Sequence, residues 1–151
     1  MGVEAVIRPD SWNLPLLVHV LGAMILVGGL LTATAAFASA RGDARLLRLG
    51  HRSLLAVSIP AWVLMFVGGE WIYRKEQLDD EPIGSAWVLI GFLVAELGGV
   101  LLVVTVILGG IGLRRLRTGH GATLMKTATV LSFVLLVAYA VAVWAMAAKP
   151  D

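Results

Sequence analysis

The chain has 151 residues, of which 59% are hydrophobic and 15% charged, with a mean hydropathy of +0.90 and a net charge of +2. Soluble domains are typically about 45–50% apolar and about 25% charged, so this composition excludes an ordinary soluble protein. The small net charge does not favour a nucleic-acid partner. The absence of cysteine excludes disulfides, thiolate metal sites and cysteine nucleophiles.

Four apolar stretches are each long enough to cross a bilayer, which takes roughly 20 helical residues. None of them alternates in polarity as a strand would, so all four are expected to be helices. Pro60, inside the second stretch, is expected to kink its helix or to mark a locally widened turn. The sequence therefore predicts one all-α domain over residues 1–151, an integral membrane four-helix bundle. Its spans are residues 14–38, 54–73, 87–113 and 124–147.

The connections between the spans predict their direction through the membrane. Lys and Arg gather on the cytoplasmic side of short connections. The connections after the first and third spans carry Arg41, Arg45, Arg48 and Arg52, and Arg114, Arg115, Arg117 and Lys126. The connection between the second and third spans, "YRKEQLDDEPIGSA", carries four acids and is expected outside with both termini. An aromatic belt is predicted at the outer ends, formed by Trp12, Trp71, Tyr73, Trp87 and Trp144.

This topology is typical of a bacterial inner-membrane protein with periplasmic N- and C-termini. The N-terminal segment "MGVEAVIRPD" lacks a basic region ahead of an apolar stretch, so we expect no cleavable signal peptide. The bilayer itself is the first predicted partner.

The motif Arg-x-Gly-His occurs twice, as "RLGHRS" over residues 48–53 and "RTGHGA" over residues 117–122. When the two motifs are aligned with each other, Gly22 aligns with Gly91 and Gly29 aligns with Gly98. Each half of the chain is then a helical hairpin, and the two hairpins form a parallel repeat about an axis along the membrane normal.

Two interpretations of the repeated motif are open. His51 and His120 would lie at equal depth and could ligate one haem b iron from opposite sides. Arg48 and Arg117 would then pair with the haem propionates. Alternatively, the motifs are only the basic rim of the bundle, where arginines orient the protein and contact lipid headgroups.

Three ionisable residues fall inside the spans: His19, Glu70 and Glu96. Glu96 lies about 13 Å along its helix from Trp87, at 1.5 Å per residue, which is close to mid-membrane. A charged carboxylate at that depth costs at least ~2.5–3.5 kcal/mol. If the first three helices share an interior, these residues predict an outward-facing site that handles a metal or protons.

Each of these residues also has a structural alternative. Glu70 can pair with Arg74 one turn later, and His19 can hydrogen-bond a carbonyl of a neighbouring helix. For Glu96 the alternatives are a bound group, a proton path and a contact with another protein.

Small residues recur every four positions on the first and third helices. Such faces let helix backbones approach closely in lipid. They are expected either to close the bundle or to form an oligomer. The residues are Gly28, Thr32, Ala36 and Ala40, and Gly91, Ala95 and Gly99.

The segments "LLVHVLGAMILVGG" and "IPAWVLMFVGG", with an Arg-rich exit from the third span, resemble small bacterial four-helix membrane proteins related to the copper-resistance-D family. The resemblance implies that His19 handles copper or haem. No nucleophile–base pair or H-E-x-x-H motif is present, which does not favour an enzyme. Two functions are expected: a small protein that handles a metal, haem or protons, or a non-catalytic accessory subunit of a larger membrane complex.

Overall fold

The computed structural model describes residues 13–75 and 86–148, and every regular element in these ranges is helical. Four helices are long and apolar enough to cross a membrane, which confirms the predicted all-α membrane bundle. Trp12, the acidic connection and both termini lie outside the described residues. The elements are α1 (Asn13–Ser39), α2 (Ala44–Ser53), the π-helical segment η2 (Leu54–Ser58), α3 (Ile59–Lys75), α4 (Ala86–Leu116) and α5 (Ala122–Ala148).

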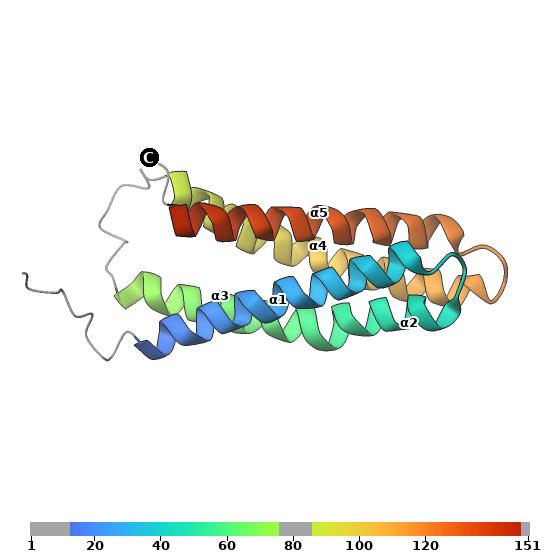
Figure 1. The fold of residues 1–151 in the computed structure, drawn as a ribbon, viewed down its shortest axis with the longest axis horizontal. Helices are drawn as coiled ribbons and strands as arrows, with labels where there is room; N and C mark the ends of the chain where they lie inside the picture. Colours follow the sequence, from blue (N-terminus) through green and yellow to red (C-terminus); the bar gives the residue numbers. More distant parts are fainter. Residues whose placement is uncertain (1–12, 76–85, 149–151) are drawn as a thin grey trace, which may run out of the picture.

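The helices pack as two pairs. α4 lies along α5, and α1 lies along the continuous helix formed by α2, η2 and α3 (Figure 1). Contacts of α1 with α5 join the pairs, whereas the contacts of α2 and α3 with α4 are sparser. The protein is therefore a multi-pass membrane protein in which one side, between α2 and α4, is loosely closed.

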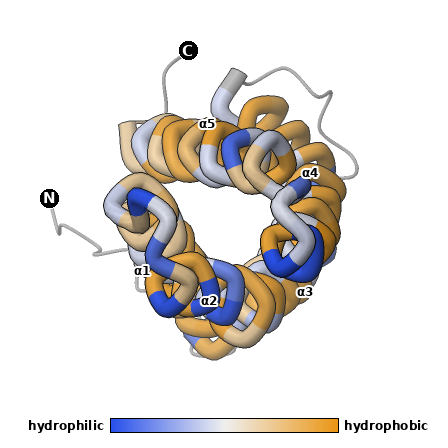
Figure 2. The backbone as a smooth tube through the Cα atoms, turned by 90° about the vertical axis from the view of Figure 1, so that its right-hand side faces the viewer, coloured by the Kyte–Doolittle hydropathy of each residue, from blue (hydrophilic) through white to orange (hydrophobic). Residues whose placement is uncertain are grey.

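The two ends of the bundle differ in chemistry. Both arginine-rich connections lie at one end, here called the basic end, which faces the viewer in Figure 2. Its arginines are Arg41, Arg45, Arg48, Arg52, Arg114, Arg115 and Arg117. The opposite end carries the described members of the predicted aromatic belt, Trp71, Tyr73, Trp87 and Trp144. There the Tyr73 ring packs edge-on against Phe92, 5.0 Å between centroids, and joins α3 to α4.

The second membrane helix begins earlier than the predicted span, at Ala44 instead of residue 54. The Asp43 carboxylate accepts a hydrogen bond from the Arg45 N–H at 2.7 Å and caps the first turn of α2. One face of α2 is buried through Leu47 and Gly50, while its arginines stay exposed. An amphipathic helix at the membrane boundary thus continues directly into the span.

Pro60 produces a widened turn, as the sequence predicted. The preceding residues form the π-helical segment η2, in which the Ile59 N–H bonds the Leu54 carbonyl five residues back. The proline lacks an N–H and its ring crowds the carbonyl of the preceding turn, so the helix widens there. Ser53 lies at the start of this segment, and its hydroxyl donates to the Gly29 carbonyl of α1 at 2.8 Å.

The closest backbone contact joins α1 to α3. A Cβ on Gly22 would lie 2.5 Å from the backbone nitrogen of Met65, and one on Gly68 would lie 2.6 Å from that of His19. Gly29 lies against the side chain of Ser58 in η2. Because only glycine fits at the backbone distances of Gly22 and Gly68, these two residues allow α1 and α3 to pack backbone to backbone.

The small-residue face predicted on α1 is only partly used. Ala36 and Ala40 are buried, but Gly28 is exposed with nothing within 4 Å of its added Cβ, and Thr32 is exposed and bonds the Gly28 carbonyl of its own helix. A helix turns once per 3.6 residues, so steps of four drift around it. The buried face alternates steps of three and four, through Gly22, Leu26, Gly29, Ala33, Ala36 and Ala40.

The small residues predicted on the third span do pack within the chain. Gly91 lies against the Met146 side chain of α5, and Gly99 lies against the Trp62 ring of α3. The Trp62 indole N–H donates to the Ala95 carbonyl at 2.9 Å. This face of α4 therefore closes the bundle.

Candidate ligand-binding cleft at the basic end

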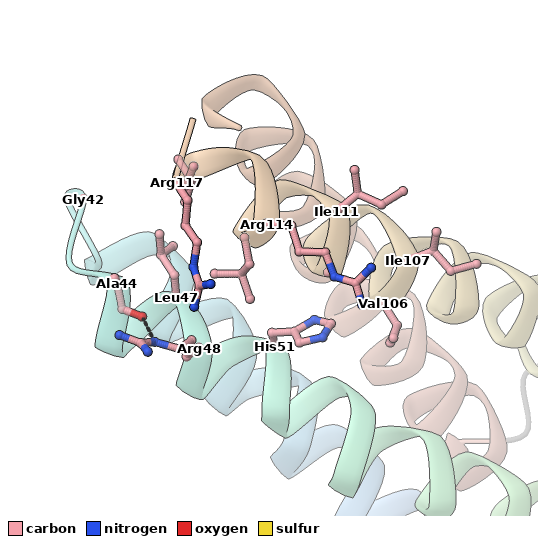
Figure 3. A pocket seen from close by; sticks show the side chains of 13 residues that line it. Gly42, Ala44, Leu47, Arg48, His51, Val106, Ile107, Ile111, Arg114 and Arg117 are labelled. Carbon is pink, nitrogen blue, oxygen red and sulfur yellow. Dashed lines mark hydrogen bonds between the residues drawn. The ribbon is translucent and has the colours of Figure 1, made fainter. Parts of the chain in front are cut away.

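A cleft of about 950 Å³ opens between α2 and α4 at the basic end (Figure 3). Its polar side chains are Arg48, His51, Arg114 and Arg117, and no acidic residue of the described ranges lines it. Its apolar wall is formed by Leu47, Val106, Ile107, Ile111, Leu113 and Leu116. We call this cleft the basic cleft. Its volume lies in the range of roughly 300–1,000 Å³ that small-molecule sites occupy.

The polar residues of the cleft come from its two sides. Arg48 and His51 are three residues apart on α2 and share a helix face, whereas Arg114 lies in the last turn of α4 and Arg117 lies in the turn that follows Leu116. Figure 3 shows Arg114 and Arg117 reaching across the cleft towards the α2 pair. The Arg48 Nε donates to the Ala44 carbonyl at 3.0 Å, which fixes the start of that side chain along its own helix.

His51 is held against two glycines of α4. A Cβ on Gly109 would lie 3.2 Å from the His51 Nδ1, and one on Gly110 would lie 3.4 Å from its Cε1. Nδ1 is buried and has no hydrogen-bond partner among the residues that the structure describes. Buried polar atoms are nearly always partnered, so this nitrogen marks a group that a ligand can satisfy.

The charges of the basic cleft favour an anion. A guanidinium is protonated at any physiological pH, and its planar fork matches carboxylate and phosphate oxygens. Three of them, Arg48, Arg114 and Arg117, line one cleft, and no described carboxylate lines it with them. The apolar wall beside them suits a hydrocarbon or aromatic body, so the cleft has the two surfaces that an amphiphilic acid needs.

The two Arg-x-Gly-His copies have different structures. Gly50 lies inside α2, against the Phe37 ring, and places His51 in the cleft. Gly119, at φ +81°, lies in the turn that ends α4. The His120 N–H bonds the Arg115 carbonyl there at 3.1 Å, and Gly119 supplies the left-handed residue of the cap.

The predicted paired-histidine site is therefore not formed. His120 is exposed, with its Nδ1 2.7 Å from the Thr118 carbonyl, and it does not line the cleft. The structure brings together His51, Arg48 and Arg117 and adds Arg114, which the sequence analysis did not select for the site. The signal that identifies Arg114 is its position in the last turn of α4, three residues before Arg117.

The three ionisable residues of the predicted outward-facing site are not assembled. The His19 Nδ1 lies 2.8 Å from the Met65 carbonyl, as the structural alternative predicted. The Arg74 Nε lies 3.0 Å from the Glu70 carboxylate, which confirms the predicted ion pair. Glu96 is exposed on α4. Within residues 13–75 and 86–148 no three His, Asp or Glu side chains are grouped to hold a metal ion.

The predicted site is not assembled because its residues point in different directions around their helix axes. Sequence position gives the depth of a residue along its helix, whereas the interior or lipid-facing side depends on how neighbouring helices pack. His19 faces α3, whereas Glu96 is exposed on α4.

The fold and the cleft define a four-helix, multi-pass membrane protein with an arginine-lined cleft at one end. Comparisons with protein-family models, with curated proteins and with solved structures find no match to this chain. The resemblance to the copper-resistance-D family thus stays a prediction, and the function is argued from the residues of the chain itself.

Proposed function

We propose that this chain is a membrane protein that binds an amphiphilic acid in the basic cleft. The observation that supports the proposal is that three arginines and one histidine line the same cleft as an apolar wall, with no acidic side chain among its described lining residues. An acid group would pair with the guanidinium groups, and the apolar body of the ligand would lie along α4. Basic pockets between membrane helices commonly take anionic headgroups.

Haem is the member of this class that would use every polar group of the cleft. Its two propionates match Arg48, Arg114 and Arg117, and its macrocycle matches the apolar wall. The imidazole of His51, whose Nδ1 has no hydrogen-bond partner among the described residues, is the side chain that would hold the iron. Bound haem would supply one-electron chemistry, while the chain supplies the site and its charge. In this proposal His51 is the single histidine ligand.

The proposal is tested by titrating the purified full-length protein with haem, with phosphatidylglycerol and with phosphatidylcholine. We expect haem to bind and to give a Soret band, and phosphatidylglycerol to compete with it better than zwitterionic phosphatidylcholine. Arg114→Gln should lower the affinity for haem and for phosphatidylglycerol by roughly tenfold, which corresponds to the ~1.4 kcal/mol of a charge-assisted contact. Arg115→Gln should change neither affinity, because Arg115 lies outside the cleft.

The titration also separates the two sources of the acid. Binding of phosphatidylglycerol that depends on Arg114, without a Soret band, would assign the cleft to lipid headgroups and contradict haem. If neither acid binds better than phosphatidylcholine, the amphiphilic-acid proposal is wrong.

We further propose that the basic end faces the cytoplasm of a bacterial inner membrane, because arginine gathers on that side. A cysteine introduced at Ala148 should then react with a membrane-impermeant maleimide in intact cells, whereas one at Thr118 should react only after lysis. Both positions are exposed at opposite ends of the bundle. Labelling of the Thr118→Cys variant in intact cells would reverse the orientation.

An accessory role in a larger membrane complex is the second candidate function. It is favoured by one specific feature, a carboxyl group exposed midway along α4 where a neighbouring helix can cover it. In that role the chain contributes contacts to an assembly, and the basic cleft serves only its lipid environment.

A further inference from the structure

Glu96 stands on the lipid-facing side of α4. It is exposed, and so are the residues around it, with Leu93 at 49%, Leu97 at 65% and Val100 at 65% of their surface open. No hydrogen bond or ion pair links Glu96 to another residue in the described part of the chain. The bundle therefore presents one carboxyl group in the middle of an otherwise apolar surface.

The described residues offer no Lys or Arg that can neutralise this carboxyl group. The Lys and Arg side chains of the described helices lie near helix ends: in α2, in the last turns of α3 and α4, and at Lys126 near the start of α5. Hydrocarbon cannot hydrogen-bond a polar group, so ionisable residues in membranes face a partner, water or the protein interior. Glu96 consequently needs a partner outside the single bundle.

We propose that a second copy of this chain covers Glu96, by α4 packing on α4 about a two-fold axis along the membrane normal. A two-fold axis brings the same residue of both copies together at equal depth. The two Glu96 carboxyl groups then hydrogen-bond each other, and each supplies the polar partner that the other lacks in lipid. No second residue type is required, which is why an isolated acid fits this arrangement.

The apolar residues of the same face fit such a contact. Leu89, Leu93, Val100 and Val103 lie at alternating steps of four and three around Glu96, and all are exposed. This is the spacing of a coiled-coil seam, in which a single polar position fixes register and number of strands. Polar side chains likewise stabilise helix pairs in lipid. The inference goes beyond ligand binding, because it concerns a surface outside the basic cleft.

Cysteine crosslinking of the full chain in native membranes tests the proposal without background, because the protein has no cysteine. Val100→Cys places a thiol one turn from Glu96. Val137→Cys, the control, places one at an exposed position in the middle of α5. On mild oxidation we expect the Val100→Cys variant to form disulfide-linked dimers, with a yield at least tenfold higher than that of the Val137→Cys variant.

Two replacements of Glu96 in the Val100→Cys background complete the test. Glu96→Leu should reduce crosslinking at least tenfold, whereas Glu96→Gln should retain most of it, because two amides can hydrogen-bond each other. Thermal stability in detergent should be unchanged in both, since the side chain faces lipid. Equal crosslinking at both cysteine positions, or a Glu96→Leu variant that crosslinks like the parent, would overturn the proposal. So would Glu96-dependent capture of a different protein without self-crosslinking.

Discussion

Gly22→Ala should destabilise the bundle, although glycine-to-alanine changes in helices normally stabilise by about 1 kcal/mol. The added Cβ would lie 2.5 Å from the Met65 nitrogen, 2.8 Å from its Cα and 3.0 Å from the Ala61 carbonyl oxygen. All three atoms are backbone, so no side chain can rotate away, and α1 must move off α3. Overpacking of this kind costs typically about 1–3 kcal/mol. In a chain of this size each kcal/mol lowers the Tm by roughly 2–4 °C.

Gly28→Ala is the matched control on the same helix. Gly28 is exposed and an added Cβ meets nothing within 4 Å, so this change should leave the Tm unchanged or raise it slightly. Thermal unfolding of the two variants in the same detergent measures the difference. Equal Tm values for both variants would mean that α1 and α3 do not make this close contact.

The sequence was sufficient to predict the membrane bundle, because each span is long and apolar without help from its neighbours. The widened turn before Pro60 was one of two predicted outcomes, the other being a kink, since a missing N–H and a bulky ring act locally. The predicted second span began at residue 54, whereas the helix that contains it begins at Ala44. The cap at Asp43 and the packing of α2 extend the helix in this direction, and neither shows in hydropathy.

The packing face of α1 shows what hydropathy cannot give. Gly28 and Thr32 matched a regular four-residue spacing, but the contact with α3 uses Gly22 and Gly29. All these residues are small and sit among apolar neighbours, so composition does not separate them. Only the direction in which a neighbouring helix lies decides which glycine is needed.

The sequence predicted only some of the residues of the basic cleft, again because side-chain direction depends on the surrounding structure. Arg48, His51 and Arg117 were selected from a repeated motif, and the structure places them together. His120 belongs to the same motif but follows the end of a helix, where the positive φ of Gly119 turns the chain away from the cleft. A short motif fixes residue types, whereas the secondary structure around each copy fixes the direction of its side chains.

His51→Ala is expected to have the second large effect, on ligand binding. If His51 holds the iron, its removal should weaken haem binding by at least tenfold, or at least ~1.4 kcal/mol, and should change the Soret band. His120→Ala is the natural control because it removes the histidine of the other motif copy, which is exposed and outside the cleft. Neither change should alter the fold, since both residues lie at the basic end.

The most direct measurement is the absorption spectrum of the purified protein and of these two variants during titration with haem. We predict a saturable Soret band for the unaltered chain and for His120→Ala, and a weakened and shifted band for His51→Ala, with equal Tm values for all three. A haem spectrum that is identical in all three proteins, or lost equally in both variants, would contradict the assignment of the basic cleft as the binding site.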